Sequence, residues 1–339
     1  MKKFAFLGAL SAVALGAGMA SATTLEDVKA RGELLCGSNA GLAGFAAPDA
    51  AGVYQGFDIA MCRAVAAAVL GDPMKVKVVP LSSETRFTAL SAGEVDMLAR
   101  TSTWTFSRDT DLKLDFVAVN YYDGQGFMVK KSLGVSSAKE LDGATVCIQT
   151  GTTTELNLAD YFKSNGMTYQ PVPLKDNAEA EQQYSAGACD VYTTDASGLA
   201  ATRATFADAG EHVILPEIIS KEPLALVVRH GDNQWGDIVR FTFDALIAAE
   251  EFGITSANVE EMSATVGTNP EINRLLGTEG ELGAMMGLDK DWAKRAIMAG
   301  GNYGEIFAAN IGESTPIGLA RGLNALWTQG GLQYSPPFR

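Results

Sequence analysis

The segment 101–108, which reads T-S-T-W-T-F-S-R, combines several hydroxyl groups with one guanidinium. A guanidinium binds a carboxylate through two parallel hydrogen bonds, so this segment is suited to holding a carboxylate. The apolar run at 95–99 just before it alternates as a buried strand does, which places the segment in a turn at the carboxyl end of that strand. Ligands bind at this edge of open α/β sheets, although the same hydroxyls would also serve to cap a following helix.

Two further polar groups follow apolar runs later in the chain. The segment 150–155, T-G-T-T-T-E, comes after the run at 146–149, and one of its Thr residues is expected to cap the next helix. The first amides of that helix form a site for an anion. Asp195 follows the expected strand at 189–193. If these groups face each other across a cleft, Arg108 and the amides suit a carboxylate and Asp195 suits an ammonium, which is the pattern that an α-amino acid requires.

Internal similarity indicates two α/β units in one chain. The segment 91–101, S-A-G-E-V-D-M-L-A-R-T, is similar to 185–195, S-A-G-A-C-D-V-Y-T-T-D. Upstream of each, 32–39, G-E-L-L-C-G-S-N, is similar to 143–150, G-A-T-V-C-I-Q-T. In the first pair the Gly is expected to end a helix in the left-handed conformation before a strand begins. Strands that alternate with helices in this way predict an α/β fold with a mainly parallel, helix-flanked sheet in each half.

Polar residues before apolar helical patterns predict where helices begin. The expected caps are Asp58 for a helix to about residue 70, Ser82 or Ser83 for a helix that ends at Gly93, and Asn177 for a helix that ends at Gly187. Further strands are expected at 34–36, 76–79 and 224–228.

The N-terminus has the pattern of a secretory signal peptide, which predicts a periplasmic protein. Lys2 and Lys3 precede an apolar run at 4–20, and A-S-A at 20–22 is a small-x-small cleavage pattern. We therefore expect residues 1–22 to be removed and the mature protein to be soluble. A membrane anchor is the alternative, but the run is short and rich in small residues, and no Cys stands at the cleavage site to carry a lipid.

Composition narrows the partners and the chemistry. A net charge of −14 argues against nucleic acid or an anionic membrane surface as partner. The two His residues lie in no metal-spaced cluster, so neither a zinc site nor a Ser-His-Asp triad is supported, and we expect no metal or cofactor. Four Cys in an exported chain favour disulfides over reduced thiols. Of the possible pairings we predict Cys36–Cys62 and Cys147–Cys189, because each pair then stays within one half.

Taken in order, these segments resemble the periplasmic solute-binding proteins of polar-amino-acid ABC transporters, solute-binding protein family 3. The similar motifs span about residues 30–245: G-F-D at 56–58, T-W-T-F-S-R at 103–108, D-F at 115–116 with Y-Y at 121–122, G-T-T-T-E at 151–155, and C-D at 189–190 leading to T-D at 194–195. A later match, G-N-Y-G-E-I-F at 301–307, resembles the closing helix of the family. The extra length and E-P-L at 222–224 resemble the general L-amino-acid-binding branch.

The resemblance implies a type II periplasmic binding protein fold with a ligand cleft between two lobes. By position, it assigns Arg108, Thr103 and the Thr153 amide to the α-carboxylate of the ligand, and Thr101 and Asp195 to its α-amine. Leu42 and Ser83 stand where many relatives carry aromatic rings, which predicts a roomier and less selective pocket. The further pocket candidates are Asn39, Arg100, Gln149 and Thr152; Arg100 would favour acidic side chains, unless it is a solvated surface residue.

The expected lobes are 23–120 together with 230–339, and 121–229. The first would carry an insertion at about 253–288 and a tail at 308–339, which would either brace that lobe or contact the transporter. The resemblance implies a monomeric receptor, not an enzyme, that binds free L-amino acids with broad specificity and delivers them to membrane permease subunits. The alternatives are an exported dehydratase-type enzyme on the same fold and a ligand-binding sensor module.

Overall fold

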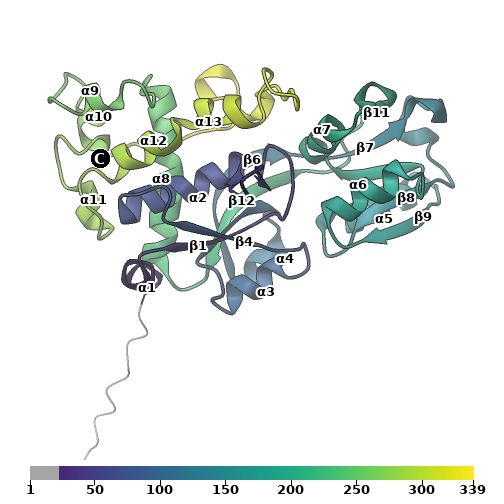
Figure 1. Cartoon of the computed structure of the whole chain (residues 1–339), viewed down its shortest axis with the longest axis horizontal. Helices are drawn as coiled ribbons and strands as arrows, with labels where there is room; N and C mark the ends of the chain where they lie inside the picture. Colours follow the sequence, from purple (N-terminus) through teal and green to yellow (C-terminus); the bar gives the residue numbers. More distant parts are fainter. Residues whose placement is uncertain (1–22) are drawn as a thin grey trace, which may run out of the picture.

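The computed structural model describes residues 23–339 as two lobes, each built on a five-stranded sheet (Figure 1). The predicted signal peptide at 1–22 lies outside the described residues. The first sheet has the order β4-β1-β5-β12-β6 and comprises Val76–Pro80, Leu34–Ser38, Met97–Thr103, Glu222–Arg229 and Leu114–Asp123. The second has the order β11-β7-β10-β8-β9 and comprises His212–Ile214, Gln125–Lys130, Val191–Asp195, Thr145–Gln149 and Gln170–Leu174. A small hairpin pairs β2 (Ala47–Pro48) with β3 (Tyr54–Gln55).

The two sheets share one topology, which confirms the internal repeat. Strands β1, β4 and β5 of the first sheet correspond to β8, β9 and β10 of the second, and each set is parallel. One antiparallel strand completes each sheet: β12 in the first and β7 in the second. Gly93 and Gly187 precede β5 and β10 with φ angles of 76° and 78°, so both adopt the predicted left-handed conformation.

The helices cover both faces of these sheets (Figure 1). The first lobe contains α1 (Thr24–Arg31), α2 (Phe57–Leu70), α3 (Arg86–Ser91), α4 (Phe106–Thr110), α8 (Asn233–Glu251), α9 (Val259–Met262), α10 (Pro270–Leu275), α11 (Leu282–Met285), α12 (Trp292–Gly300) and α13 (Tyr303–Asn310). The second contains α5 (Thr153–Ser164), α6 (Asn177–Ser185) and α7 (Ala196–Thr205).

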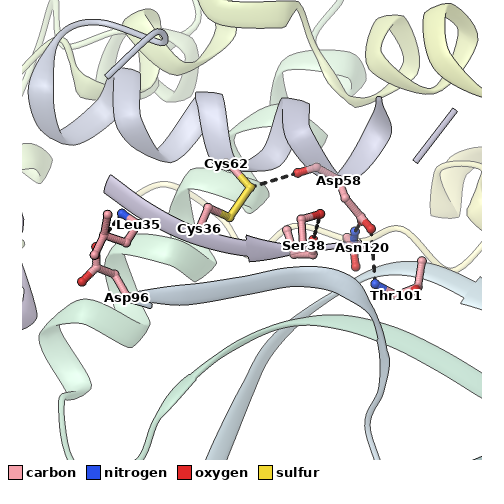
Figure 2. Close-up of a disulfide and its surroundings, with 9 residues drawn as sticks. Leu35, Cys36, Ser38, Asp58, Cys62, Asp96, Thr101 and Asn120 are labelled. Carbon is pink, nitrogen blue, oxygen red and sulfur yellow. Dashed lines mark hydrogen bonds between the residues drawn. A yellow bond between two sulfur atoms is a disulfide. The ribbon is translucent and has the colours of Figure 1, made fainter. Parts of the chain in front are cut away.

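The two disulfides have the predicted pairing. Cys36 on β1 bonds to Cys62 on α2, with the Cα atoms 6.1 Å apart (Figure 2), and Cys147 on β8 bonds to Cys189 just before β10, with the Cα atoms 5.6 Å apart. Each bridge closes a loop within one lobe, and loop-closure entropy of this kind contributes about 3–4 kcal/mol to stability. The first bridge ties α2 to β1, which lies next to the central strand β5.

Several predicted helix caps are wrong. Helix α2 begins after Gly56, whose φ of 131° only glycine adopts easily, and Asp58 is buried inside the first turn instead of capping it. Asp176, not Asn177, caps α6 by accepting a hydrogen bond from the Glu179 amide at 2.9 Å. An Asp with extended backbone directly before a helix is a better cap than an Asn already inside it.

The segment around α3 and the end of β5 also differ from expectation. Helix α3 starts only at Arg86 and takes no side-chain cap; the Ser82 hydroxyl instead accepts from the Thr85 amide at 3.2 Å in the preceding turn. Strand β5 continues to Thr103, because its pairing with β12 extends to Leu224, so the polar turn begins at Trp104 and not at Thr101. Thr152 caps α5 as predicted, accepting from the Glu155 amide at 3.3 Å.

The C-terminal tail packs on the first lobe. The Asn324 side chain exchanges two hydrogen bonds with the backbone of Tyr122 on β6, at 2.7 and 3.1 Å. Arg321 pairs with Glu250 of α8 at 3.0 Å. These contacts hold the tail against the first lobe, as expected if the tail braces that lobe, which is one of the two roles considered from the sequence. Helices α9–α11 of the insertion gather at the end of this lobe that lies away from the second lobe (Figure 1).

The chain crosses between the lobes where β6 leads into β7 and where it returns into β12. Strand β12 pairs with β6 from Glu222 to Arg229 and with β5 from Leu224 to Val227, which favours a return crossing near Glu222 instead of near residue 229. The exact lobe boundaries stay a prediction.

Candidate functional site

A cavity of about 40 Å³ lies between the lobes at the carboxyl ends of strands from both sheets. All of the predicted ligand-binding residues except Arg108 line it: Asn39, Leu42, Ser83, Arg100, Thr101, Thr103, Gln149, Thr152, Thr153 and Asp195. The structure therefore brings together residues that are distant in sequence, as the strand-end rule predicts. Their contact with a ligand stays a prediction.

Thr101 lies in this cavity with a backbone that few residues adopt. Its φ of 38° is unfavourable for a β-branched residue and costs about 1–3 kcal/mol, so this conformation persists only where neighbouring contacts hold it. The Asp58 carboxylate does so: it accepts from the Thr101 amide and from Asn120 Nδ2, both at 3.2 Å (Figure 2). Burial raises the pKa of Asp58 to about 7, against the opposing effect of these hydrogen bonds. Asp58 is thus a support for the site.

Arg100 is buried in the cavity wall and is not a solvated surface residue. Its Nε donates to the Leu81 carbonyl at 3.1 Å and its Nη2 donates to Ser83 Oγ at 3.2 Å. Burial lowers its pKa to about 10, so it remains a cation at neutral pH. Gln149, buried in the same wall, has no hydrogen-bond partner for Nε2 in the described part of the chain. Both side chains present donors to the cavity.

Arg86 also lines the cavity, and the sequence analysis missed it. It is 3% exposed, its Cζ lies 4.7 Å from the centre of the Phe87 ring, and within residues 23–339 its Nε has no hydrogen-bond partner. Burial, with repulsion from Arg100 and Arg108, lowers its pKa well below the usual range. The signal was the S-x-x-R spacing at 83–86, which puts a hydroxyl and a guanidinium on one face of a helical turn.

The other lining residues that the sequence did not mark as ligand contacts are Thr154, Asn177, Tyr192, Thr194, Ser197 and Gly198.

Arg108 is not among the residues that line the cavity. Its Nη1 donates to the Thr103 carbonyl at 3.0 Å, and its Cζ lies 5.0 Å from the centre of the Phe87 ring. Burial lowers its pKa, while Glu222 and Asp195 oppose that change. In this arrangement Arg108 supports the end of β5, and a direct bond to a ligand carboxylate remains a prediction.

The N-terminus of α5 faces the same space from the second lobe. Thr152 Oγ1 donates to the Gln149 carbonyl at 2.7 Å while it caps the helix, so the turn is fixed at both ends. The first N–H groups of a helix have no partner within it and carry the positive end of its dipole. Thr153 Oγ1 lies 3.4 Å from Thr103 Oγ1 of the first lobe, so the lobes meet here.

Asp195 supplies the carboxylate of the cavity. It stands before α7 but makes no side-chain cap hydrogen bond, so helix capping does not explain it. Burial raises its pKa well above the usual range, and repulsion from Asp123 and Glu222 adds to this, against the attraction of Arg86 and Arg108. The cavity therefore joins buried cations and helix amides with one carboxylate, an arrangement complementary to a zwitterion that carries a further oxygen-bearing group.

Within residues 23–339, no helix is both long and apolar enough to span a bilayer. The same residues contain no cluster of three or more His, Cys, Asp and Glu side chains that would hold a metal ion.

Comparison with known proteins identifies relatives over the whole chain. Residues 34–257 match the bacterial extracellular solute-binding proteins, family 3. The glutamate/glutamine/aspartate/asparagine-binding protein BztA of Rhodobacter capsulatus is 74% identical over 339 residues, covering 100% of both chains. The general L-amino acid-binding periplasmic protein AapJ of Rhizobium johnstonii is 58% identical over 327 residues, covering 96% of each.

A solved structure with a similar fold is an ABC transporter/periplasmic binding protein from Brucella ovis with glutathione bound. It is 56% identical, has a TM-score of 0.91, and the match covers 94% of this chain and 100% of that one.

The unpaired cation at Arg86 predicts a stability change. Replacing it by Met keeps the volume and removes the cost of burying a charge that makes no hydrogen bond at Nε. We expect Arg86→Met to raise the melting temperature without added ligand by about 1–2 °C, the shift that corresponds to about 1 kcal/mol when unfolding a chain of roughly 300 residues gains about 2.1 cal/mol/K per residue. Differential scanning calorimetry measures it. The control is Arg321→Met, because Arg321 donates from Nε to the Asn324 carbonyl and from both Nη atoms to Glu250, and should not gain stability. A lower melting temperature for Arg86→Met would show that Arg86 is already well paired.

Proposed function

Because this chain belongs to family 3 of the bacterial extracellular solute-binding proteins, we propose that it is a periplasmic receptor that binds L-amino acids between its lobes and delivers them to the permease of an ABC transporter. The observation that carries the proposal is the interlobe cavity, with Arg86 and Arg100 in its wall and Asp195 across it. The names of the R. capsulatus and R. johnstonii relatives support an amino acid as the ligand.

The proposed role in transport depends on a ligand that contacts residues of both lobes. We propose that Arg108, Thr103 and the first amides of α5 hold the α-carboxylate, and that Asp195 and Thr101 hold the α-ammonium. One ligand then contacts both lobes at once, so binding stabilises the arrangement in which they are close together. A micromolar affinity, about −8 kcal/mol, is sufficient to shift such an equilibrium.

The remaining wall suits amino acids with an acidic or amide side chain. Arg86, Arg100 and Gln149 all present hydrogen-bond donors, and an acceptor such as a carboxylate or carboxamide oxygen would satisfy the unpartnered Nε2 of Gln149. Leu42 and Ser83 leave room where an aromatic ring would clamp one side chain. We therefore propose broad specificity, led by glutamate, glutamine, aspartate and asparagine.

We further propose that the protein is a monomer without catalytic activity, that residues 1–22 form a cleaved signal peptide, and that the lobes divide near the two crossings. A dehydratase would require an acid or base next to its substrate, and Asp195 is the one carboxylate among the described residues that line the cavity. Mass spectrometry of the bound ligand after incubation separates binding from turnover.

Calorimetric titration with the common L-amino acids tests the proposed function. We expect several L-amino acids to bind within about 1–2 kcal/mol of one another, because a pocket without a ring clamp discriminates weakly. D-isomers should bind poorly, since the two charged poles fix where the side chain must point. Absence of any binding would contradict the function. One amino acid that binds a thousandfold more tightly than all others would contradict only the breadth.

Asp195 predicts the pH dependence of binding. Its pKa is raised in the protein, so the carboxylate loses its charge as the pH falls toward that value, and only the charged form pairs with an ammonium. The affinity for L-glutamine, whose own groups do not titrate between about pH 5 and 8, should therefore fall as the pH is lowered toward the pKa of Asp195. Asp195→Asn should lose about 2–5 kcal/mol of affinity and show a flatter profile. A variant with the wild-type profile would remove Asp195 from the site.

A second cavity next to the first provides space for a ligand larger than a single amino acid. It has a volume of about 200 Å³ and shares the lining residues Asn39, Arg100 and Asn177 with the first cavity, so the two cavities lie against the same side chains. The glutathione in the B. ovis structure is a γ-glutamyl peptide, whose chain continues from the glutamate side chain. We propose that γ-glutamyl peptides bind here with their glutamyl group in the first cavity and the remainder in the second.

Filling the second cavity tests this assignment. Ala178 lines it but not the first cavity, so Ala178→Phe should weaken glutathione binding by about tenfold or more while the affinity for L-glutamate changes little. Ala178→Ser, which keeps the space, is the control, and competition calorimetry measures both ligands. Equal losses for both ligands, or wild-type glutathione binding by Ala178→Phe, would contradict the second subsite.

A further inference from the structure

Glu222 is a buried carboxylate at the point where the chain returns from the second lobe to the first. It is the first residue of β12 and is 1% exposed. Four side chains donate hydrogen bonds to it. Oε2 accepts from Thr103 Oγ1 at 2.5 Å and from Thr153 Oγ1 at 2.8 Å, and Oε1 accepts from Asn157 Nδ2 and from Ser220 Oγ, both at 2.7 Å. Both oxygens are thus fully used.

The four donors come from different parts of the molecule. Thr103 ends β5 of the first lobe, Thr153 and Asn157 lie on α5 of the second lobe, and Ser220 lies in the connection between them. When the lobes separate, α5 moves away from β5, and the carboxylate loses donors from one side. A buried carboxylate that loses its partners destabilises the structure by several kcal/mol unless water replaces them. Neighbouring charges act in both directions: Arg86 and Arg108 attract Glu222, and Asp123 and Asp195 repel it.

We propose that Glu222 is an interlobe latch, a positioning residue that stabilises the closed arrangement of the lobes and slows release of the ligand. The inference rests on the proposed function only for the statement about ligand release. The latch itself is a property of the two lobes.

The hydrogen bonds to Glu222 also decide whether two hydroxyls in the cavity wall act as donors or as acceptors toward a ligand. A threonine hydroxyl has one proton, and Thr103 and Thr153 both donate theirs to Glu222. Each hydroxyl is then left with acceptor capacity toward the cavity, which suits an N–H group of the ligand. The proposed contact of the ligand α-carboxylate with Thr103 Oγ1 therefore requires this hydroxyl to exchange its bond to Glu222 for one to the ligand, while Thr153, Asn157 and Ser220 still donate to Glu222.

Two variants test the latch from opposite sides. Glu222→Gln keeps the shape of the side chain but replaces one acceptor oxygen by an NH₂ donor. Asn157→Ala removes a donor of the second lobe, and Asn157 does not line the ligand cavity. The control is Glu217→Gln, because Glu217 accepts from Ser137 Oγ and from the Ala138 amide within the second lobe alone.

The measurements are the radius of gyration by small-angle scattering, with and without L-glutamine, and the ligand dissociation rate by stopped flow. We expect Glu222→Gln and Asn157→Ala to increase the radius of gyration without ligand, and to speed dissociation by about tenfold with little change in the association rate. Saturating ligand should restore the wild-type radius. The latch is supported if both variants change the radius of gyration or the dissociation rate and Glu217→Gln changes neither.

Wild-type scattering and dissociation in both variants would overturn the proposal, even if their melting temperatures fall, because the carboxylate would then be structural only. If the wild-type protein binds no amino acid, the scattering measurement alone decides on the latch, and it is the proposed function that fails.

Discussion

The shape of the ligand cavity depends on the hydrogen bonds of the Glu222 carboxylate, because they join β5 of one lobe to α5 of the other at the cavity edge. A carboxylate in the protein interior needs its full set of donors, and one lobe does not supply them all. Because donors from both lobes are needed to satisfy the buried Glu222 carboxylate, its hydrogen bonds hold the two lobes together. This connection places the interlobe contact beside the site and next to the crossing strands.

Several groups at the site destabilise the folded protein, and contacts in the surrounding structure compensate for them. Among the residues that the structure describes, buried Arg86 has no partner for Nε; Asp195 is held where its charge is disfavoured, and Thr101 has a strained backbone. Each is a cost that a zwitterionic ligand reduces, since its charges complete these pairs. The surrounding structure tolerates these costs because it is strongly cross-linked: a disulfide holds α2 on β1, the Asp58 carboxylate holds Thr101, and the C-terminal tail braces β6. Because only a ligand with complementary charges relieves these costs, the site is expected to select ligands by their charge.

Local chemistry predicted most of the fold and much of the site. Glycine caps and repeated segments located β5 and β10, and the rule of strand ends brought most of the predicted residues to one cavity. The errors occurred where the deciding quantity is three-dimensional. Whether Asp58 caps a helix or supports a strand depends on the conformation of Gly56, which the sequence does not state. Arg86 was missed because its entry into the cavity depends on where α3 begins. Arg108 does not line the cavity, and its guanidinium donates to the Thr103 carbonyl instead.

The internal repeat gives a physical reason why the site suits a zwitterion. The segments 91–101 and 185–195 align so that Thr101 and Asp195 occupy equivalent positions at the ends of β5 and β10. Because the two sheets share one topology and face each other, equivalent positions converge on the same space, and both residues line the cavity. A hydroxyl in one copy and a carboxylate in the other give this point a single negative charge, where two carboxylates would repel each other. The cations Arg86 and Arg100 belong to the first copy only, so divergence of two similar halves has separated positive from negative charge across the cleft.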